Sequence, residues 1–384
     1  MNGKDHITKY INPQNFFNCR ADFHTAGVVM NKYVKRYLVD AMGGMAQGLF
    51  ASLLIGTIIK TLGQLLLKIG DNVVFQFLVD AGNFASEAHV VGAAMAISIG
   101  YALKAPGLVL FSLAAVGATA NTLGGAGGPL AVLVIAIIAC ELGNLVSKKT
   151  KVDILVTPLV TIISGVLLAV LTAKWIGLGA SSVGNLIMWA TNLHPFVMGI
   201  IVSVIVGIVL TLPISSAAIC AALSLTGLAG GAAVAGCSAN MVGFAILSFK
   251  ENRWGGLVSQ GLGTSMLQMP NIIKNPKIWI PVILTSAITG PLSTCLFKLQ
   301  MNGAAVSSGM GTCGLVGQIG MVTGWYSPVE SAVAQGATAI VPGAMEWIGL
   351  VLISFVLPAV LTWAFGKLFR KIGWIKDGDL TLQN

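Results

Sequence analysis

The feature that most constrains this chain is a long absence of charge: no Lys, Arg, Asp or Glu occurs between Lys174 and Lys250. One bilayer crossing needs about 20 predominantly apolar residues, so this stretch is long enough for several crossings. Over all 384 residues, 55% are hydrophobic and only 9% are charged, whereas charged residues make up about 25% of an ordinary soluble domain. The sequence therefore predicts an all-α polytopic membrane protein.

Apolar runs divided by polar or glycine-rich breaks predict about ten transmembrane helices. The seventh and eighth are divided only by the run AGGAAVAG at 229–236, so this boundary stays open. The expected spans are 41–59, 88–103, 106–122, 129–147, 154–173, 195–213, 215–232, 234–249, 278–297 and 345–366.

The basic residues provide an independent check on this number, because they gather in five clusters beside apolar runs. With ten spans and a cytoplasmic N-terminus, all five clusters lie on the inner side, as the positive-inside rule requires. We therefore expect both termini in the cytoplasm. The net charge of +9 then suits topology and anionic lipid better than nucleic acid, which needs a basic face on a soluble domain. The clusters are Lys32/Lys35/Arg36, Lys148/Lys149/Lys151, Lys250/Arg253, Lys274/Lys277 and Lys367/Arg370/Lys371.

Two charge-free stretches remain outside these spans. The first, 254–273, lies between two inner-side clusters, so it must enter and leave on the same face, as a re-entrant hairpin does. The second, 302–325, has seven glycines in 24 residues, more than an ordinary spanning helix holds. Irregular backbone at membrane depth persists only where protein buries it or where it lines a cavity. Two such hairpins in one half of a protein indicate a transporter binding site.

The positions of the spans and hairpins predict three parts. Residues 1–40 form a cytoplasmic or interfacial segment, in which residues 23–39 are expected to form an amphipathic helix. Residues 41–175 hold five conventional spans and close-packing positions such as Gly44 and Gly48, as expected of a scaffold or dimer interface. Residues 190–372 hold the other spans and both hairpins, and are expected to handle the solute.

Amides and hydroxyls are the main polar groups of the second half, and burying them is unfavourable unless they find partners. Asn and Gln satisfy the hydroxyls of a sugar in donor–acceptor pairs. An anionic substrate would need core Arg or Lys, and a coupling cation would need buried carboxylates. A neutral, hydroxylated solute therefore fits best, although interhelical hydrogen bonding is an equally good explanation for any single residue. The candidate binding residues of this kind are Asn240, Gln260, Thr264, Ser265, Gln268, Asn271, Thr312 and Gln318.

Two titratable residues complete the candidate site. His194 precedes Pro195 at the start of a span. It is either an interfacial or helix-capping residue, or it bonds a sugar hydroxyl or relays a proton. Glu346 flanks the tenth span, and its carboxylate could accept two hydroxyl hydrogen bonds.

Catalytic and metal-binding patterns are not found. The sequence has no Walker loop, HExxH or GxSxG motif, and its six cysteines show no metal-ligand spacing. We expect no catalytic residue, no metal site and no cofactor.

Several long runs resemble those of phosphotransferase-system sugar permeases. They are DAMGGMAQGLFASLLIGTIIKTLG (40–63), KTKVDILVTP (149–158), GCSANMVGFAILSFKEN (236–252), GLGTSMLQMPNIIKNPKIWIP (261–281) and GMGTCGLVGQIG (309–320). Within that family, the chain is similar to the stand-alone EIIC group that includes the perfringolysin regulator PfoR.

The resemblance implies a multi-pass protein of the bacterial inner membrane, a homodimer, and a second half that moves against a dimeric scaffold to carry the sugar. It also implies separate EIIA and EIIB partners, since no EIIB domain follows the last span. The sequence departs from glucose-type permeases in lacking the Gly-Ile-Thr-Glu-Pro motif whose Glu binds the sugar, so that role is not carried over to Glu346.

Three functions follow as hypotheses. The first is a sugar permease with an elevator-type movement. The second is a membrane sensor that binds a solute without transporting it, a role also assigned within the PfoR group. The third is an ion-coupled transporter of another small molecule, in which His194 or Glu346 titrates.

Overall fold

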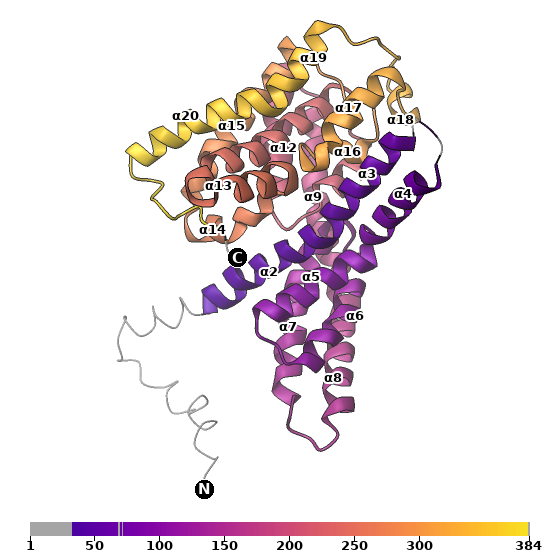
Figure 1. Ribbon diagram of the computed structural model, residues 1–384, viewed down its shortest axis with the longest axis vertical. Helices are drawn as coiled ribbons and strands as arrows, with labels where there is room; N and C mark the ends of the chain where they lie inside the picture. Colours follow the sequence, from indigo (N-terminus) through magenta and orange to yellow (C-terminus); the bar gives the residue numbers. More distant parts are fainter. Residues whose placement is uncertain (1–32, 68–69, 71, 383–384) are drawn as a thin grey trace.

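A computed structural model describes residues 33–67, 70 and 72–382 (Figure 1). These residues form helices and connections and include no β-strand, apart from an isolated bridge between Gly227 and Met301. Six helical stretches in this described part are long and apolar enough to cross a membrane. The predicted all-helical membrane protein is therefore confirmed. The number of ten spans, the re-entrant course of the hairpins and the cytoplasmic termini remain predictions, and most of the segment 1–40 lies outside the described residues.

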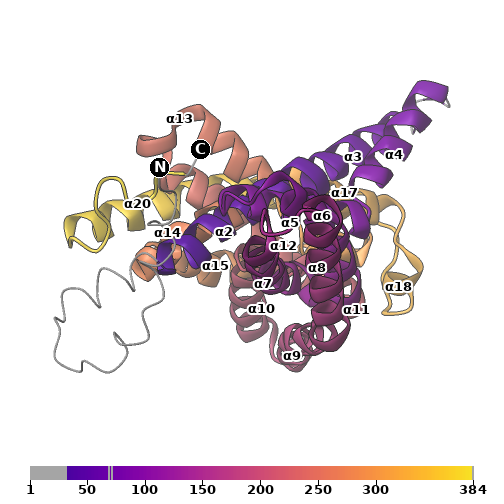
Figure 2. The same cartoon turned by 90° about the horizontal axis from the view of Figure 1, so that it is seen from below.

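The first apolar helix is longer than the expected span 41–59, because it runs from Lys35 to Leu67. It contains α2 (Ala41–Leu49) and α3 (Ile55–Leu67). The next helix, α4 (Val73–Ala85), was not predicted, since Asp80 interrupts its apolar run. Figures 1 and 2 both show α4 side by side with α3. Gly82 allows this approach, because a Cβ there would collide with the backbone of α3.

Four helices form a bundle below this pair in Figure 1: α5 (Ala88–Ala102), α6 (Gly107–Gly124), α7 (Gly128–Val146) and α8 (Asp153–Leu168). The predicted close packing at Gly44 is confirmed, because a Cβ on Gly44 would lie 2.6 Å from the Ser98 carbonyl oxygen of α5. The helix that begins with α8 continues through α9 (Lys174–Thr191). A single Lys did not end the helix, and the stretch Asp153–Thr191 leaves the bundle and reaches the second half of the chain.

The second half surrounds α12 (Gly227–Leu247), in which nearly every residue is buried. Its neighbours are α10 (Pro195–Thr211), α15 (Ile280–Pro291) and α20 (Leu357–Lys371). The expected spans 215–232 and 234–249 are not two helices: α12 runs unbroken through 229–236, and only the short α11 (Ser216–Ala222) precedes it. The small residues that suggested a break permit contact with α10, since a Cβ on Gly236 would overlap the Ser203 carbonyl.

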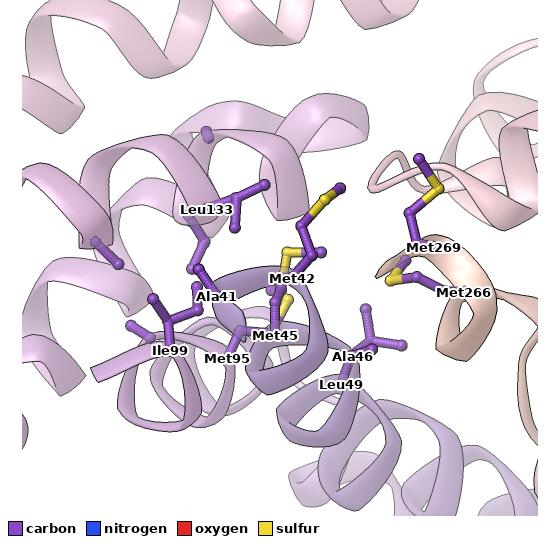
Figure 3. Packing of buried hydrophobic residues seen from close by; sticks show 14 of the residues in the cluster. Ala41, Met42, Met45, Ala46, Leu49, Met95, Ile99, Leu133, Met266 and Met269 are labelled. Carbon is purple, nitrogen blue, oxygen red and sulfur yellow. The ribbon is translucent and has the colours of Figure 1, made fainter. Parts of the chain in front are cut away.

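The two halves share one hydrophobic core. Met42, Met45 and Leu49 of α2 belong to the same buried cluster as Met266 and Met269 of the first predicted hairpin. Figure 3 shows these methionines approaching one another across the space between α2 and that hairpin. The boundary between a scaffold at 41–175 and a transport part at 190–372 remains a prediction.

Candidate functional site

The first predicted hairpin, 254–273, folds as two helical segments joined at an extended residue. The first segment contains α13 (Phe249–Val258) and continues to Gly263. Thr264 has extended backbone, and its hydroxyl accepts a hydrogen bond from the Met266 backbone N–H at 3.2 Å. The second segment ends with α14 (Met269–Lys274). We call the residues around Thr264 the first tip.

The second predicted hairpin, 302–325, contains α16 (Ala305–Ser308) and α17 (Val316–Tyr326). Between them, Gly311 and Gly314 have φ of +53° and +51°, which disfavour any residue with a side chain. A Cβ on Gly311 would also lie 2.5 Å from the Cβ of Cys237 on α12. The glycine-rich composition therefore produces a tight turn against α12, which we call the second tip.

The two tips are in direct contact. The Thr312 hydroxyl donates a hydrogen bond of 2.6 Å to the Gly261 carbonyl oxygen, and both groups are buried. The second tip also reaches the first half of the chain, where Gly314 packs on Ile58 of α3. Two stretches about 50 residues apart in sequence thus form one structure beside α3.

A cavity of about 360 Å³ lies where the tips meet the first half of the chain. We call it the tip cavity, and its volume falls within the range of small-molecule sites, roughly 300–1,000 Å³. Gly263, Thr264 and Cys313 line it from the tips, while Leu49 and Asn121 line it from α2 and α6. It also lies next to the connection between α10 and α11.

The chemistry of the tip cavity is uncharged. None of the described residues that line it is Lys, Arg, Asp or Glu. Its polar groups are one amide and several hydroxyls, and part of their capacity is already used: the Asn121 side-chain amide donates to the Ala88 carbonyl at 2.8 Å, and the Ser216 hydroxyl donates to the Gly309 carbonyl at 2.7 Å. The hydroxyl-bearing residues are Ser86, Thr122, Ser215, Ser216 and Thr264.

Of the sequence-predicted site residues, Thr264 lines the tip cavity and Thr312 joins the tips. Asn240 and Ser265 lie behind the cavity in a buried network. The Thr211 hydroxyl lies 2.8 Å from the Ser265 hydroxyl and donates to Asn240 Oδ1 at 3.3 Å. Gln318 donates to the Ser238 hydroxyl at 3.2 Å, while its Oε1 is buried without a partner.

Three further predicted residues form a chain of amides away from the cavity. Gln268 donates to Gln260 Oε1 at 2.9 Å and to the Leu380 carbonyl at 3.0 Å. Asn271 donates to Gln268 Oε1 at 2.8 Å and to the Thr381 carbonyl at 2.9 Å. All three amide side chains are buried. Gln260 in turn donates to the Ser248 hydroxyl at 2.8 Å and to the Gly256 carbonyl at 2.9 Å. Through Gln268 and Asn271, this chain of amides holds the segment 373–382, here called the C-terminal segment, against the first hairpin.

Ion pairs strengthen the attachment of the C-terminal segment. Asp377 lies 2.7 Å from Lys250 and 2.9 Å from Arg370, and Arg370 also contacts Glu251 at 2.8 Å. The sequence analysis gave the residues after the last span no structural role. Leu380, an apolar residue among polar ones, was the available signal, and the structure shows it buried.

The two titratable candidates lie at helix N-termini. His194 is exposed, and its Nδ1 accepts from the Phe196 N–H at 3.4 Å at the start of α10. Glu346 accepts from the Gly343 N–H at 2.8 Å at the start of α19 (Ala344–Val351). Neither lines the tip cavity. Among the described residues, no group of His, Cys, Asp and Glu is arranged to hold a metal ion.

Comparison with known protein families identifies the class of this chain. A family model described as "Phosphotransferase system, EIIC" matches residues 39–382. The chain belongs to this family. The predicted resemblance to phosphotransferase-system permeases is therefore confirmed, whereas membership of the PfoR group remains a prediction. The permease is a multi-pass membrane protein of a class that handles sugar-like substrates. No curated protein matches the chain.

The sequence analysis of the permease placed every candidate binding residue in the second half and so missed the residues of the first half that line the tip cavity. Asn121 was available as a signal, since it stands within a largely apolar span, where an amide needs a partner. Its position in the tip cavity depends on how α6 packs.

Proposed function

We propose that the permease binds a neutral, hydroxylated solute, most simply a sugar, in the tip cavity and carries it across the membrane. The observation that supports this best is the uncharged lining at the place where both tips meet the first half, where an apolar wall carries one amide and several hydroxyls. A sugar hydroxyl both donates and accepts, so it can pair with Asn121 and Thr264 in place of water. A charged solute would be left without a counter-charge, which is strongly unfavourable at membrane depth.

Movement of the second half against the first would carry the solute between the two sides. The buried cluster that includes Met42 and Met45 on α2 and Met266 and Met269 near the first tip supports this proposal. Methionine side chains are flexible and adapt to altered neighbours, so this contact can be remade after a shift. Within the family's system, phosphorylation of the sugar would be carried out by separate EIIA and EIIB proteins, and the first half would provide the homodimer interface.

Transport of labelled sugars into proteoliposomes tests the proposal, measured with and without a proton gradient. Uptake without a gradient supports the permease, strict gradient dependence supports an ion-coupled transporter, and binding without uptake supports a sensor. The positions of His194 and Glu346 at helix N-termini, outside the tip cavity, favour the first outcome.

Thr264→Val tests the site within this assay. One lost hydrogen bond is worth about 0.5–1.5 kcal/mol, so the sugar concentration for half-maximal uptake should rise about 2- to 10-fold. Thr172→Val is the matched control, because Thr172 bonds only the Leu168 carbonyl of its own helix, outside the tip cavity. Equal uptake by wild type and Thr264→Val would remove Thr264 from the site.

A further inference from the structure

A second cavity opens where several helices end, and it shares no lining residue with the tip cavity. Its volume is about 570 Å³. The end of α9, the start of α10 and the connection between α11 and α12 form one side, and residues 300–302 and 332–337 form the other. We call it the helix-end cleft. In the predicted topology, the connection at 192–194 lies on the outer side of the membrane.

Asn302 is the informative residue in this cleft. Its side chain is 1% exposed, and its Nδ2 donates to Gln300 Oε1 at 3.2 Å. Its Oδ1 is buried and has no hydrogen-bond donor. Leaving a buried acceptor unsatisfied costs about 1–3 kcal/mol, and such groups are rare in folded proteins. Asn302 lines the cleft, so a turn of its amide toward the cleft would let a ligand hydroxyl donate to this oxygen.

Other groups in the cleft can act as donors toward a ligand. Gln300 is exposed at the rim and carries a side-chain NH₂. The first turn of α12 has no side-chain cap, because the Thr226 hydroxyl donates to Gln335 Oε1 at 2.9 Å instead. Gln335 is fixed in turn by donating to the Ser224 carbonyl at 3.2 Å. The cleft therefore offers an acceptor at Asn302 and donors around it.

The remaining lining limits the class of ligand. None of the described residues that line the cleft carries a charge. Met188, Leu193, Met198 and Leu223 provide an apolar wall. A fully ionised phosphate would suit the N-terminus of α12 but cannot donate to Asn302. A hydroxyl can do both, and the C–H face of a sugar or polyol matches the apolar wall.

We propose that the helix-end cleft is a second binding site, specific for a neutral polyhydroxylated ligand such as a sugar or sugar alcohol. Asn302 accepts from one ligand hydroxyl, and Gln300 donates to another. This site does not depend on the transport function proposed for the tip cavity. Its position at the helix ends makes it accessible from the outer side in the predicted topology.

Protection from alkylation tests this site directly. Ser224→Cys places a thiol at the exposed edge of the cleft, in a protein in which Cys19 and Cys295 are replaced by Ser. The rate of modification by N-ethylmaleimide is measured with glucose, maltose, sorbitol or sulfate present. We expect a neutral compound to slow modification and sulfate, which has no hydrogen-bond donor, to have no effect. Absence of protection by all three neutral compounds, or equal protection by sulfate, would overturn the proposal.

Variants of the two cavities separate this site from the transport site. Asn302→Leu removes the unsatisfied oxygen, so the ligand-free protein should be at least as stable as the wild type. The ligand concentration that halves the rate of alkylation should rise about tenfold. If Asn302→Leu does not fold, Gln300→Leu at the exposed rim is tested in its place and should also weaken protection by the ligand. Thr264→Val in the tip cavity should leave protection unchanged. Protection that survives both cleft variants but is lost in Thr264→Val would refute the assignment.

Discussion

Replacing Gln268 by Leu should detach the C-terminal segment from the first hairpin. Gln268 is fully buried, and its side-chain NH₂ serves both Gln260 Oε1 and the Leu380 carbonyl. Leu has nearly the same length and no polar atom. The Leu380 carbonyl keeps a hydrogen bond from Asn252 Nδ2 at 2.8 Å. However, Gln260 Oε1 loses its donor and one N–H of Asn271 loses its acceptor, so two buried groups are left unpaired. Each such group costs about 1–3 kcal/mol. The expected loss in free energy of unfolding is therefore about 2–6 kcal/mol.

Gln318→Leu is the matched control for this prediction. Gln318 is also buried, but it makes one bond of 3.2 Å to Ser238, and its Oε1 is already unpartnered. The substitution loses one ordinary hydrogen bond and removes one unsatisfied oxygen, so the net change should lie within about 1 kcal/mol of zero.

Two measurements distinguish the variants. Reversible unfolding in mixed detergent micelles gives the stability difference, and limited proteolysis reports release of the C-terminal segment. We expect Gln268→Leu to be less stable and to be cleaved faster within residues 373–382. Equal stability of Gln268→Leu and wild type, with the segment still protected, would refute the reasoning. A loss for Gln318→Leu as large as that for Gln268→Leu would also refute it, because burial alone would then explain both.

Three other predictions concern the second tip and the C-terminal segment. Gly311→Ala should destabilise the protein more than Gly227→Ala. Both glycines have positive φ, which costs a residue with a side chain about 1–2 kcal/mol, but only at Gly311 would the added Cβ collide with α12. Unfolding of the two variants in parallel checks this, and equal losses in free energy of unfolding would contradict it. Leu380→Ala should cost about 2–5 kcal/mol in free energy of unfolding, and an unchanged stability would show that the segment does not form part of the core. Lys250 lowers the pKa of Asp377 below its ordinary value of 3.8, so the ionised carboxylate contributes stability above that pH and loses it as the pH falls through the lowered pKa. The stability difference between wild type and Asp377→Asn should therefore vanish in acid, and a difference that grew with acidity would contradict this origin.

Hydropathy and charge in the sequence determined the class of this protein. Burial in lipid is a local property of each apolar run, so the helices at 88–103, 106–122 and 129–147 were predicted close to their observed bounds. Glycine spacing also carried local information, since the turn at Gly311 needs a positive φ that composition can reveal. The absence of charge indicated where the backbone departs from simple spanning helices.

Only the tertiary structure decided the partners of the polar groups. A buried amide must find a hydrogen bond, but nothing local specifies whether the partner is a solute, another amide or a distant carbonyl. Gln268 pairs with Leu380, 112 residues away, and Thr264 and Asn121 line one cavity only because α6 and the first tip both border it. The sequence could name the groups that require partners. Packing between helices that are remote in sequence determined which of these polar groups line a cavity and which bond to another part of the chain.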